Sequence, residues 1–281
     1  MQLRTGIPLL SDLDALVGTD LYRTHTQYNR DFLARHGQAL DGYGKHWGQD
    51  PFQLWSRRWE YPFVAERLLA FIRKQGDRPV TILDAGSGVT YFDYFICDQA
   101  PNASVVCVDY DKTYPEMFAA INANTPHARV SFRQASLQDL PLETASLDAV
   151  ACISVLEHTD NYDQIITEFA RTLRTGGAMV LTFDLSLDGK FELARPVAKR
   201  LLDSVARHFE FVGEENPKVQ LEAMDQQRDA ILSTDAIKRT APELLPWRYP
   251  LLKGLHDLAK GKGWTGGFRS KSVFCLDARK R

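Results

Sequence analysis

Short β-rich runs alternate with helical patterns over residues 80–185, and this alternation is the feature that most limits how the chain can fold. Between the runs, apolar residues recur at helical spacing, most clearly in 160–174, and Gly176-Gly177 is expected to end that helix. The runs are VTILD (80–84), SVVCVD (104–109), RVSFRQ (129–134), LDAVACIS (147–154) and AMVLTFD (178–184). Strands that alternate with helices predict an α/β protein, a parallel sheet with helices on both faces.

The segment before this core, residues 1–78, is predicted to be an N-terminal helical part. It contains an aromatic cluster at 47–63, and it ends in a helix with one apolar stripe. The cluster has two interpretations: core between this part and the sheet, or a lid over the functional site that excludes water. Arg57 and Arg58 within it are expected to be exposed helix charges, or else contacts of an anionic ligand.

Residues 79–281 are predicted to form the main domain, with further elements after the alternating core. We expect a helix at about 193–207, strands at 209–213 and 271–277, and an insertion at about 214–268 with one or two short helices. The insertion and the N-terminal part flank the carboxyl ends of the strands, where added segments usually set ligand choice.

Composition excludes several classes of protein. The formal net charge is −2, which leaves no electrostatic footprint for nucleic acid. No apolar run is long enough to span a membrane, and the N-terminus lacks the apolar core of a signal peptide, so a cytoplasmic protein is expected. The four cysteines, Cys97, Cys107, Cys152 and Cys275, are not at metal-ligand spacing, and Cys107 and Cys152, within apolar strand-like runs, are expected to be buried free thiols.

The stretch TILDAGSGVTYFDYFI (81–96) places a glycine turn between the first strand and a helix. Gly86 and Gly88 allow a tight turn and the close approach of a ligand, although a purely structural turn would use them too. A dinucleotide fingerprint needs a glycine where Tyr91 stands, and no P-loop lysine follows Gly88. The turn therefore suits a nucleoside without phosphates, and Asp109 at the end of the second strand can bind both ribose hydroxyls.

As a set, ILDAGSG, VCVDYD, ASLQDLP, LDAVACISVLEH and LRTGGAMVLTF resemble the motifs of class I S-adenosylmethionine-dependent methyltransferases, in family order over residues 78–186. The resemblance implies a seven-stranded, mostly parallel sheet whose last strand is antiparallel, and S-adenosylmethionine as cofactor. It also implies a set of cofactor-binding residues: Asp84, Gly86, Ser87 and Gly88 at the methionine part, Asp109 at the ribose, Tyr110, Ser136 and Leu137 at the adenine, and Ile153 and Ser154 near the sulfonium. The chain departs from the family at Thr90, often glycine, where threonine narrows the freedom of the backbone. It departs again at Ser136, often acidic, where a serine can still form a hydrogen bond with the adenine.

Methyl transfer to an oxygen usually needs a general base, and His158, just after the fourth strand, is the candidate. Histidine at such a place also often packs or caps a helix. Glu157 is expected to be structural. Asp184 could bind substrate, or a metal together with Asp160 or Asp163, but no compact ligand motif supports a metal, and His256 is expected to be a surface residue.

The sequence favours O-methylation of a small molecule, a sugar or a secondary metabolite, and leaves N- or C-methylation open. ISVLEH lacks the Asn/Asp-Pro-Pro-Tyr segment of base-amino methyltransferases. Two alternatives remain: a non-catalytic S-adenosylmethionine-binding partner subunit, and a nicotinamide oxidoreductase, which Tyr91 disfavours. A homodimer is possible, and neither nucleic acid nor membrane is expected as a partner.

Overall fold

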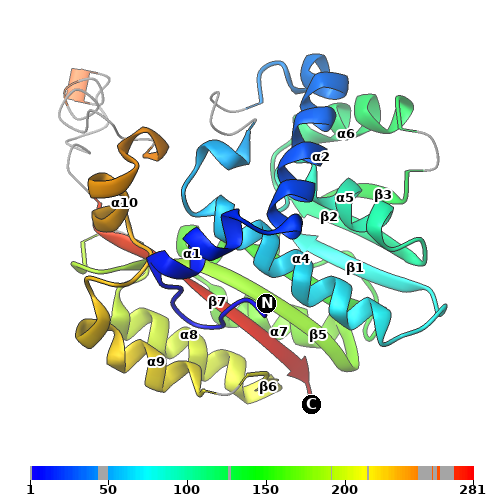
Figure 1. The fold of residues 1–281 in the computed structure, drawn as a ribbon. Helices are drawn as coiled ribbons and strands as arrows, with labels where there is room; N and C mark the ends of the chain where they lie inside the picture. Colours follow the sequence, from blue (N-terminus) through cyan, green and yellow to red (C-terminus); the bar gives the residue numbers. More distant parts are fainter. Residues whose placement is uncertain are drawn as a thin grey trace.

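A twisted sheet forms the centre of the molecule in the computed structural model, which describes residues 2–43, 50–125, 128–190, 192–213, 215–245, 255, 258–259 and 269–281 (Figure 1). In this part of the chain the sheet has seven strands in the order β3-β2-β1-β4-β5-β7-β6. The strands are β1 (Val80–Ala85), β2 (Ala103–Asp109), β3 (Val130–Gln134), β4 (Leu147–Ile153), β5 (Leu173–Ser186), β6 (Phe209–Phe211) and β7 (Lys271–Lys280).

Strands β1 to β5 are parallel, and β7 is antiparallel to both of its neighbours, β5 and β6. The predicted α/β class, with a mostly parallel sheet and an antiparallel last strand, is confirmed. The strand order reverses between β1 and β4, because the chain leads from β1 outward to β3 and then returns to the other side. In sheets of this kind, ligands bind at the carboxyl ends of the strands beside such a reversal.

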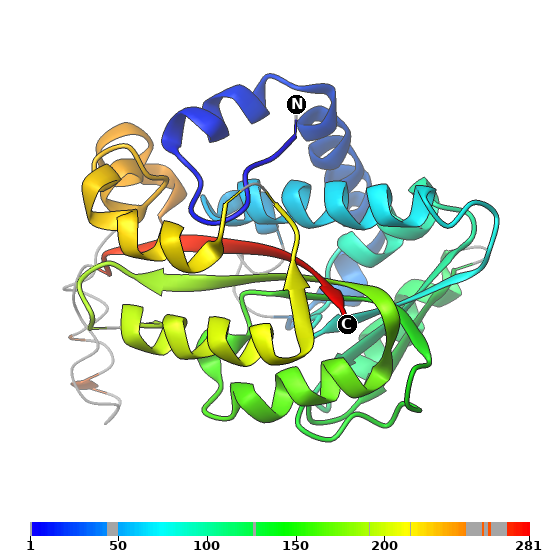
Figure 2. The ribbon, with the colours of Figure 1, turned by 90° about the horizontal axis from the view of Figure 1, so that it is seen from below.

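Helices cover both faces of the sheet, as Figure 2 shows from below: the N-terminal helices and α4 lie on one side and the green and yellow helices α7 and α8 on the other. The α-helices are α1 (Leu10–Val17), α2 (Asp20–His36), α4 (Arg57–Arg73), α5 (Phe92–Gln99), α6 (Tyr114–Ala123), α7 (Tyr162–Thr172), α8 (Arg195–His208), α9 (Pro217–Ala223) and α10 (Thr234–Thr240). Short 3-10 helices lie at η1 (Gly37–Leu40), η2 (Pro51–Gln53), η3 (Leu156–His158), η4 (Met224–Gln227) and η5 (Pro242–Leu244).

Alternate residues of each strand enter different hydrophobic layers, because side chains in a strand point to opposite faces. Ile82 belongs to the layer that contains Trp59 and Phe95, whereas its neighbour Leu83 belongs to the layer that contains Phe169. The first layer joins the N-terminal segment to the sheet in one continuous core. Of the aromatic cluster, Phe52, Trp55, Trp59, Tyr61 and Phe63 are buried, as the core interpretation predicts, and Trp47 lies outside the described residues.

One predicted boundary is wrong. Helix α7 ends at Thr172, and β5 begins at once and continues through Gly176-Gly177, which we expected to be a helix stop. The pairing of β4 with β5 starts at Leu147 and Leu173, shifts in register, and resumes at Ala149 and Ala178. Gly176, with φ of 74°, supplies the left-handed residue that this irregularity needs.

The helix predicted at about 193–207 corresponds to α8. The strand predicted at 209–213 corresponds to β6, which is shorter than predicted. Within the predicted insertion, the described residues contain α9, η4, α10 and η5. Residues 246–254 and 260–268, which include most of LLPWRYPLL and the glycine-rich stretch, lie outside the described residues.

Candidate active site

The glycine turn after β1 adopts a conformation that requires glycine. Gly86 and Gly88 have φ of 74° and 56°, in the left-handed region. A Cβ on Gly86 would overlap the side chain of Val155, and one on Gly88 would overlap the hydroxyl of Tyr43. The bare faces of both glycines are thus covered by protein atoms, whereas the sequence predicted that a ligand would approach there.

Asp109, the predicted ribose ligand, ties the end of β2 to this turn. Its Oδ2 accepts a hydrogen bond from the backbone N–H of Gly88 at 3.2 Å, and its Oδ1 accepts one from the N–H of Asp111 at 3.2 Å. A carboxylate has about four acceptor positions. Asp109 therefore keeps capacity for further donors while it fixes the loop.

The three residues predicted to frame the adenine do not line the pocket between the ends of β1 and β4. Tyr110 is 82% exposed. The Ser136 Oγ accepts from the N–H of Gln138 at 3.2 Å, in a local turn, and Leu137 packs against the core of the opposite face. Their predicted contacts with the adenine therefore stay predictions.

A pocket of about 190 Å³ lies at the carboxyl ends of β1 and β4. It brings together six of the predicted cofactor residues: Asp84, Gly86, Ser87, Gly88, Ile153 and Ser154. The rest of its lining is Tyr43, Pro51, Leu54, Arg57, Tyr61 and Thr90. A larger hollow of about 550 Å³, near Arg4 and Arg67, contains none of the predicted site residues, so we place the site at the smaller pocket.

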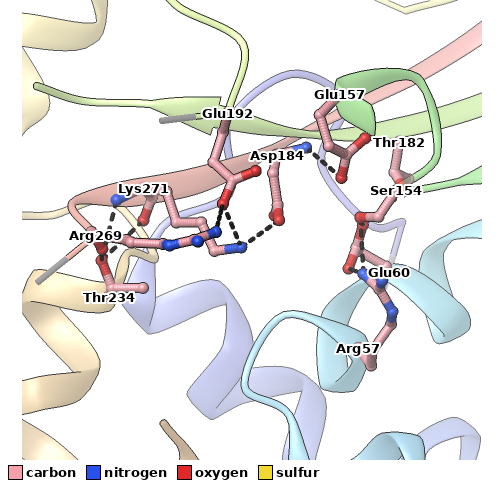
Figure 3. A network of polar contacts seen from close by, with 10 residues as sticks. All are labelled: Arg57, Glu60, Ser154, Glu157, Thr182, Asp184, Glu192, Thr234, Arg269 and Lys271. Carbon is pink, nitrogen blue, oxygen red and sulfur yellow. Dashed lines mark hydrogen bonds and ion pairs between the residues drawn. The ribbon is translucent and has the colours of Figure 1, made fainter. Parts of the chain in front are cut away.

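Glu60 joins helix α4 to Ser154, just after β4, and to Thr182, inside β5, and it is the residue that the sequence analysis missed (Figure 3). Its Oε1 accepts from the hydroxyls of Ser154 and Thr182, each at 2.6 Å, and its Oε2 forms an ion pair with Arg57. Arg57 Nη1 also donates to Ser154 Oγ at 2.7 Å. Ser154 has φ of 51°, an uncommon backbone for a non-glycine residue.

The charges of this cluster compensate one another inside the protein. Glu60 is 0% exposed. Burial alone would raise the pKa of Glu60, but Arg57 and the hydrogen bonds from Ser154 and Thr182 bring it below its ordinary value. Arg57 is therefore a fixed cation at the pocket wall, which corrects its expected role as an exposed helix charge. A single acid inside an otherwise aromatic helical run was the signal in the sequence that could have identified Glu60.

A second charged network connects Asp184 of β5 with Lys271 at the start of β7 (Figure 3). Lys271 pairs with Asp184, and with Glu192 at 3.4 Å, and Arg269 pairs with Glu192 at 3.0 Å. Asp184 was expected to bind substrate, or a metal with Asp160 or Asp163, and here its partner is Lys271. No group of three potential metal ligands occurs in the described part of the chain.

Glu157 and His158, adjacent in η3, have different surroundings. The Oε1 of Glu157 accepts from the N–H of Asp184 at 3.2 Å, and burial, together with the nearby Asp184 carboxylate, raises the pKa of Glu157 well above its ordinary value. This contact matches the structural role expected for Glu157. His158 is at the surface; partial desolvation of its ring lowers its pKa, while Glu192 and Asp184 act in the opposite direction. His256 lies outside the described residues.

Comparison with known proteins gives the class of this site. Residues 83–181 match a family model described as a methyltransferase domain. A curated protein of Mycobacterium tuberculosis described as "Probable S-adenosylmethionine-dependent methyltransferase" is 35% identical over 101 residues, which are 36% of this chain and 34% of that protein. The malonyl-[acyl-carrier protein] O-methyltransferase of Methylococcus capsulatus is 28% identical over 120 residues, 42% of each chain.

Residues 83–181 thus form a Rossmann-like methyltransferase domain of the S-adenosylmethionine-dependent class. The aligned stretch spans about a third of the length of the Mycobacterium tuberculosis relative. Among solved structures, the [4+2]-cyclase SpnF has a TM-score of 0.50 at 18% identity, over 99% of each chain, and shows likeness of fold alone. None of the described helices is both long and apolar enough to cross a bilayer.

The charged groups of the pocket fit S-adenosylmethionine, which carries a carboxylate, an ammonium, a sulfonium and ribose hydroxyls but no phosphate. Arg57 is a cation that can meet the carboxylate, Asp84 an acid that can meet the ammonium, and Asp109 an acceptor beside the turn. The volume is below the roughly 300–1,000 Å³ of typical ligand pockets, partly because Tyr43 lies over Gly88 and accepts a hydrogen bond from the N–H of Val89.

Proposed function

We propose that the protein transfers the methyl group of S-adenosylmethionine to a small-molecule acceptor, by O-methylation of a sugar or secondary metabolite. The observation that carries this proposal is the pocket itself. It combines the glycine turn, with Asp109 bound to it, and the end of β4 in one place at the reversal of strand order.

We assign the cofactor's methionine part to Arg57 and Asp84. The Nη1 group of Arg57 is committed to Glu60 and Ser154, which fixes the plane of the guanidinium and leaves its other N–H groups for a carboxylate. Asp109 takes the ribose hydroxyls, and Ser87, Ile153 and Ser154 border the cofactor, as the family resemblance implies.

The bound cofactor supplies an already activated methyl group on a sulfonium, so the protein mainly aligns the acceptor and excludes water. The apolar and aromatic wall of Tyr43, Pro51, Leu54 and Tyr61 suits the exclusion of water. His158 is proposed to accept the proton of the acceptor hydroxyl. Since its pKa is lowered, its imidazole is neutral at pH 7 and able to act as a base.

Support for a small acceptor comes from the charge of the chain. The net charge of −2 gives no basic surplus for nucleic acid. The names of two relatives state an acyl-carrier-protein O-methyltransferase and a demethylmenaquinone methyltransferase, so matches to this domain include different acceptors. The fold does not define a reaction by itself.

Calorimetric titration of S-adenosylmethionine and S-adenosylhomocysteine into the wild-type protein and Asp109→Asn tests the cofactor. Asparagine keeps one oxygen for the Gly88 N–H, so the turn is retained while an acceptor for the ribose is lost. We expect micromolar-range binding that weakens by about tenfold, roughly 1.4 kcal/mol, in the variant. Absence of binding to folded wild-type protein would refute the proposal.

The role of His158 is tested with an acceptor identified from a panel of hydroxylated small molecules. His158→Gln should lower kcat by about 10²- to 10⁴-fold and leave the affinity for S-adenosylmethionine unchanged. In the wild type, kcat should fall as the pH drops below the lowered pKa of His158, and this limb should be absent in the variant. An unchanged kcat in His158→Gln would exclude it as the base.

A further inference from the structure

Two buried carboxyl groups lie together under the proposed methionine site. Asp84, at the end of β1, is 5% exposed and lines the pocket. Asp93, in the first turn of α5, is 1% exposed, and neither of its carboxyl oxygens has a hydrogen-bond partner of good geometry. The Asp84 carboxyl and the Cys107 thiol lie next to it.

No described cation balances this pair. Among the described residues, the titratable groups that act on one or both carboxyls are phenols, thiols and one further acid: Tyr43, Tyr61, Tyr94, Cys97, Cys107, Cys152 and Asp109. Arg57 lines the same pocket, but its charge is matched by Glu60. Two neighbouring buried carboxyls without a cation cannot both ionise, because each opposes the charge of the other and both are removed from water.

The pKa values of the two carboxyl groups shift in the direction that this geometry predicts. Burial, and then the Asp93 carboxyl, raise the pKa of Asp84 well above its ordinary value. Burial raises the pKa of Asp93 to about 6, and the adjacent Asp84 carboxyl and Cys107 thiol act in the opposite direction. The pair therefore retains a proton more strongly than exposed carboxyls do, and its titration belongs to the pair and not to either residue.

We propose that Asp84 and Asp93 act as one acid pair that shares a single proton, and that the ammonium group of the bound cofactor expels this proton into solvent. The ammonium keeps its own protons and supplies the positive charge that the pair lacks, so both carboxyls can ionise. This inference rests on the proposed function, since it takes S-adenosylmethionine as the ligand. It makes Asp93, which has no place among the predicted site residues, a positioning residue for cofactor affinity.

The test is calorimetric titration at pH 6.5 in two buffers with different ionisation enthalpies, from which the number of protons released on binding is obtained. At this pH a free α-amino group, with a pKa near 7.7–8.0, is already protonated and contributes little. We expect release of about one proton per S-adenosylmethionine or S-adenosylhomocysteine bound, and none for 5′-methylthioadenosine, which has no ammonium group. Affinity for S-adenosylmethionine should rise by up to about tenfold per pH unit while the pair is protonated.

Asp93→Asn removes the neighbouring carboxyl that opposes the ionisation of Asp84, so fewer protons should be released on binding than in the wild type. Asp98→Asn is the matched control on the same helix, because Asp98 is exposed and bonds only to Tyr28 in the described contacts. Proton release in that control should equal the wild type. If Asp93→Asn does not fold, the comparison of S-adenosylmethionine with 5′-methylthioadenosine on the wild type decides the question.

The outcomes separate this inference from the proposed function. Binding of S-adenosylmethionine without proton release, or release that is undiminished in Asp93→Asn or occurs with 5′-methylthioadenosine, would overturn the inference and leave the cofactor assignment intact. Failure of folded wild-type protein to bind any of the ligands would overturn both.

Discussion

Individual buried polar residues fix how helices are positioned against the sheet in this structure. Glu60 is the clearest case, because removing its carboxylate would leave Arg57 charged without a partner and two hydroxyls without an acceptor. Losing one partner of a buried pair typically costs about 3–5 kcal/mol. Glu60 therefore fixes the position of α4 against β4 and β5, and with it the position of Arg57 in the pocket wall.

His25 makes stability depend on pH. It is 0% exposed, Nδ1 lies 2.8 Å from the hydroxyl of Tyr91, and burial lowers its pKa to about 3. Between about pH 6.5 and 3 the unfolded chain binds a proton there that the folded protein does not. His25 therefore stabilises the fold fully above pH 6.5, and this contribution decreases by about 1.4 kcal/mol per pH unit as the pH falls toward 3.

Urea unfolding of the wild type and His25→Gln between pH 7 and 5 checks this prediction. The difference in free energy of unfolding between the two proteins should shrink by about 1–2 kcal/mol over this range, because only the wild type has the buried imidazole. A difference that does not change with pH would contradict the pKa assigned to His25.

At the scale of elements, β5 depends on a glycine for its pairing with β4. A Cβ on Gly177 would lie 2.8 Å from the carbonyl oxygen of Arg174 and 3.0 Å from that of Asp148. Because backbone atoms cannot move aside cheaply, Gly177→Ala should lower the free energy of unfolding by about 1–3 kcal/mol. Thermal or urea unfolding measures this directly.

Gly37→Ala provides the matched control for that substitution. Gly37 has φ of −52°, and a Cβ there would have nothing within 4 Å. This change should be neutral or stabilise by about 0.4–1 kcal/mol, since alanine restricts the unfolded chain. Equal effects at the two positions would show that crowding at Gly177 is unimportant.

For the whole molecule, the important point is that the N-terminal part and the sheet share one core. Phe32, Trp55 and Trp59 belong to the same hydrophobic layer as Phe95 and Val180. We therefore expect the chain to unfold in one cooperative transition, with equal calorimetric and van 't Hoff enthalpies. Two separate transitions would instead support the division at residue 78 that the sequence suggested.

Periodicity and turn chemistry made most of the fold predictable, because each depends on neighbours in the chain. The five core strands, the helices between them and the glycine turn at 86–88 appear where the sequence placed them. The boundary at Gly176-Gly177 failed because pairing with β4 outweighs the local preference of glycine to end a helix. Six cofactor residues predicted from the motifs gather in one pocket, whereas Tyr110, Ser136 and Leu137 do not line it.

The α/β class, the order of the motifs and the family that they resemble could all be inferred from the sequence, because each depends on the spacing of residues that are near one another in the chain. Three features became visible in the folded protein alone: Arg57 forms part of the pocket wall, Glu60 contacts Ser154, and Asp93 lies against Asp84. Glu60 reaches across from another part of the chain, and whether Asp93 lies in a dry interior depends on how the layers pack. The sequence shows which residues are polar. The packing of the layers determines which of these polar groups are removed from water and therefore interact with one another.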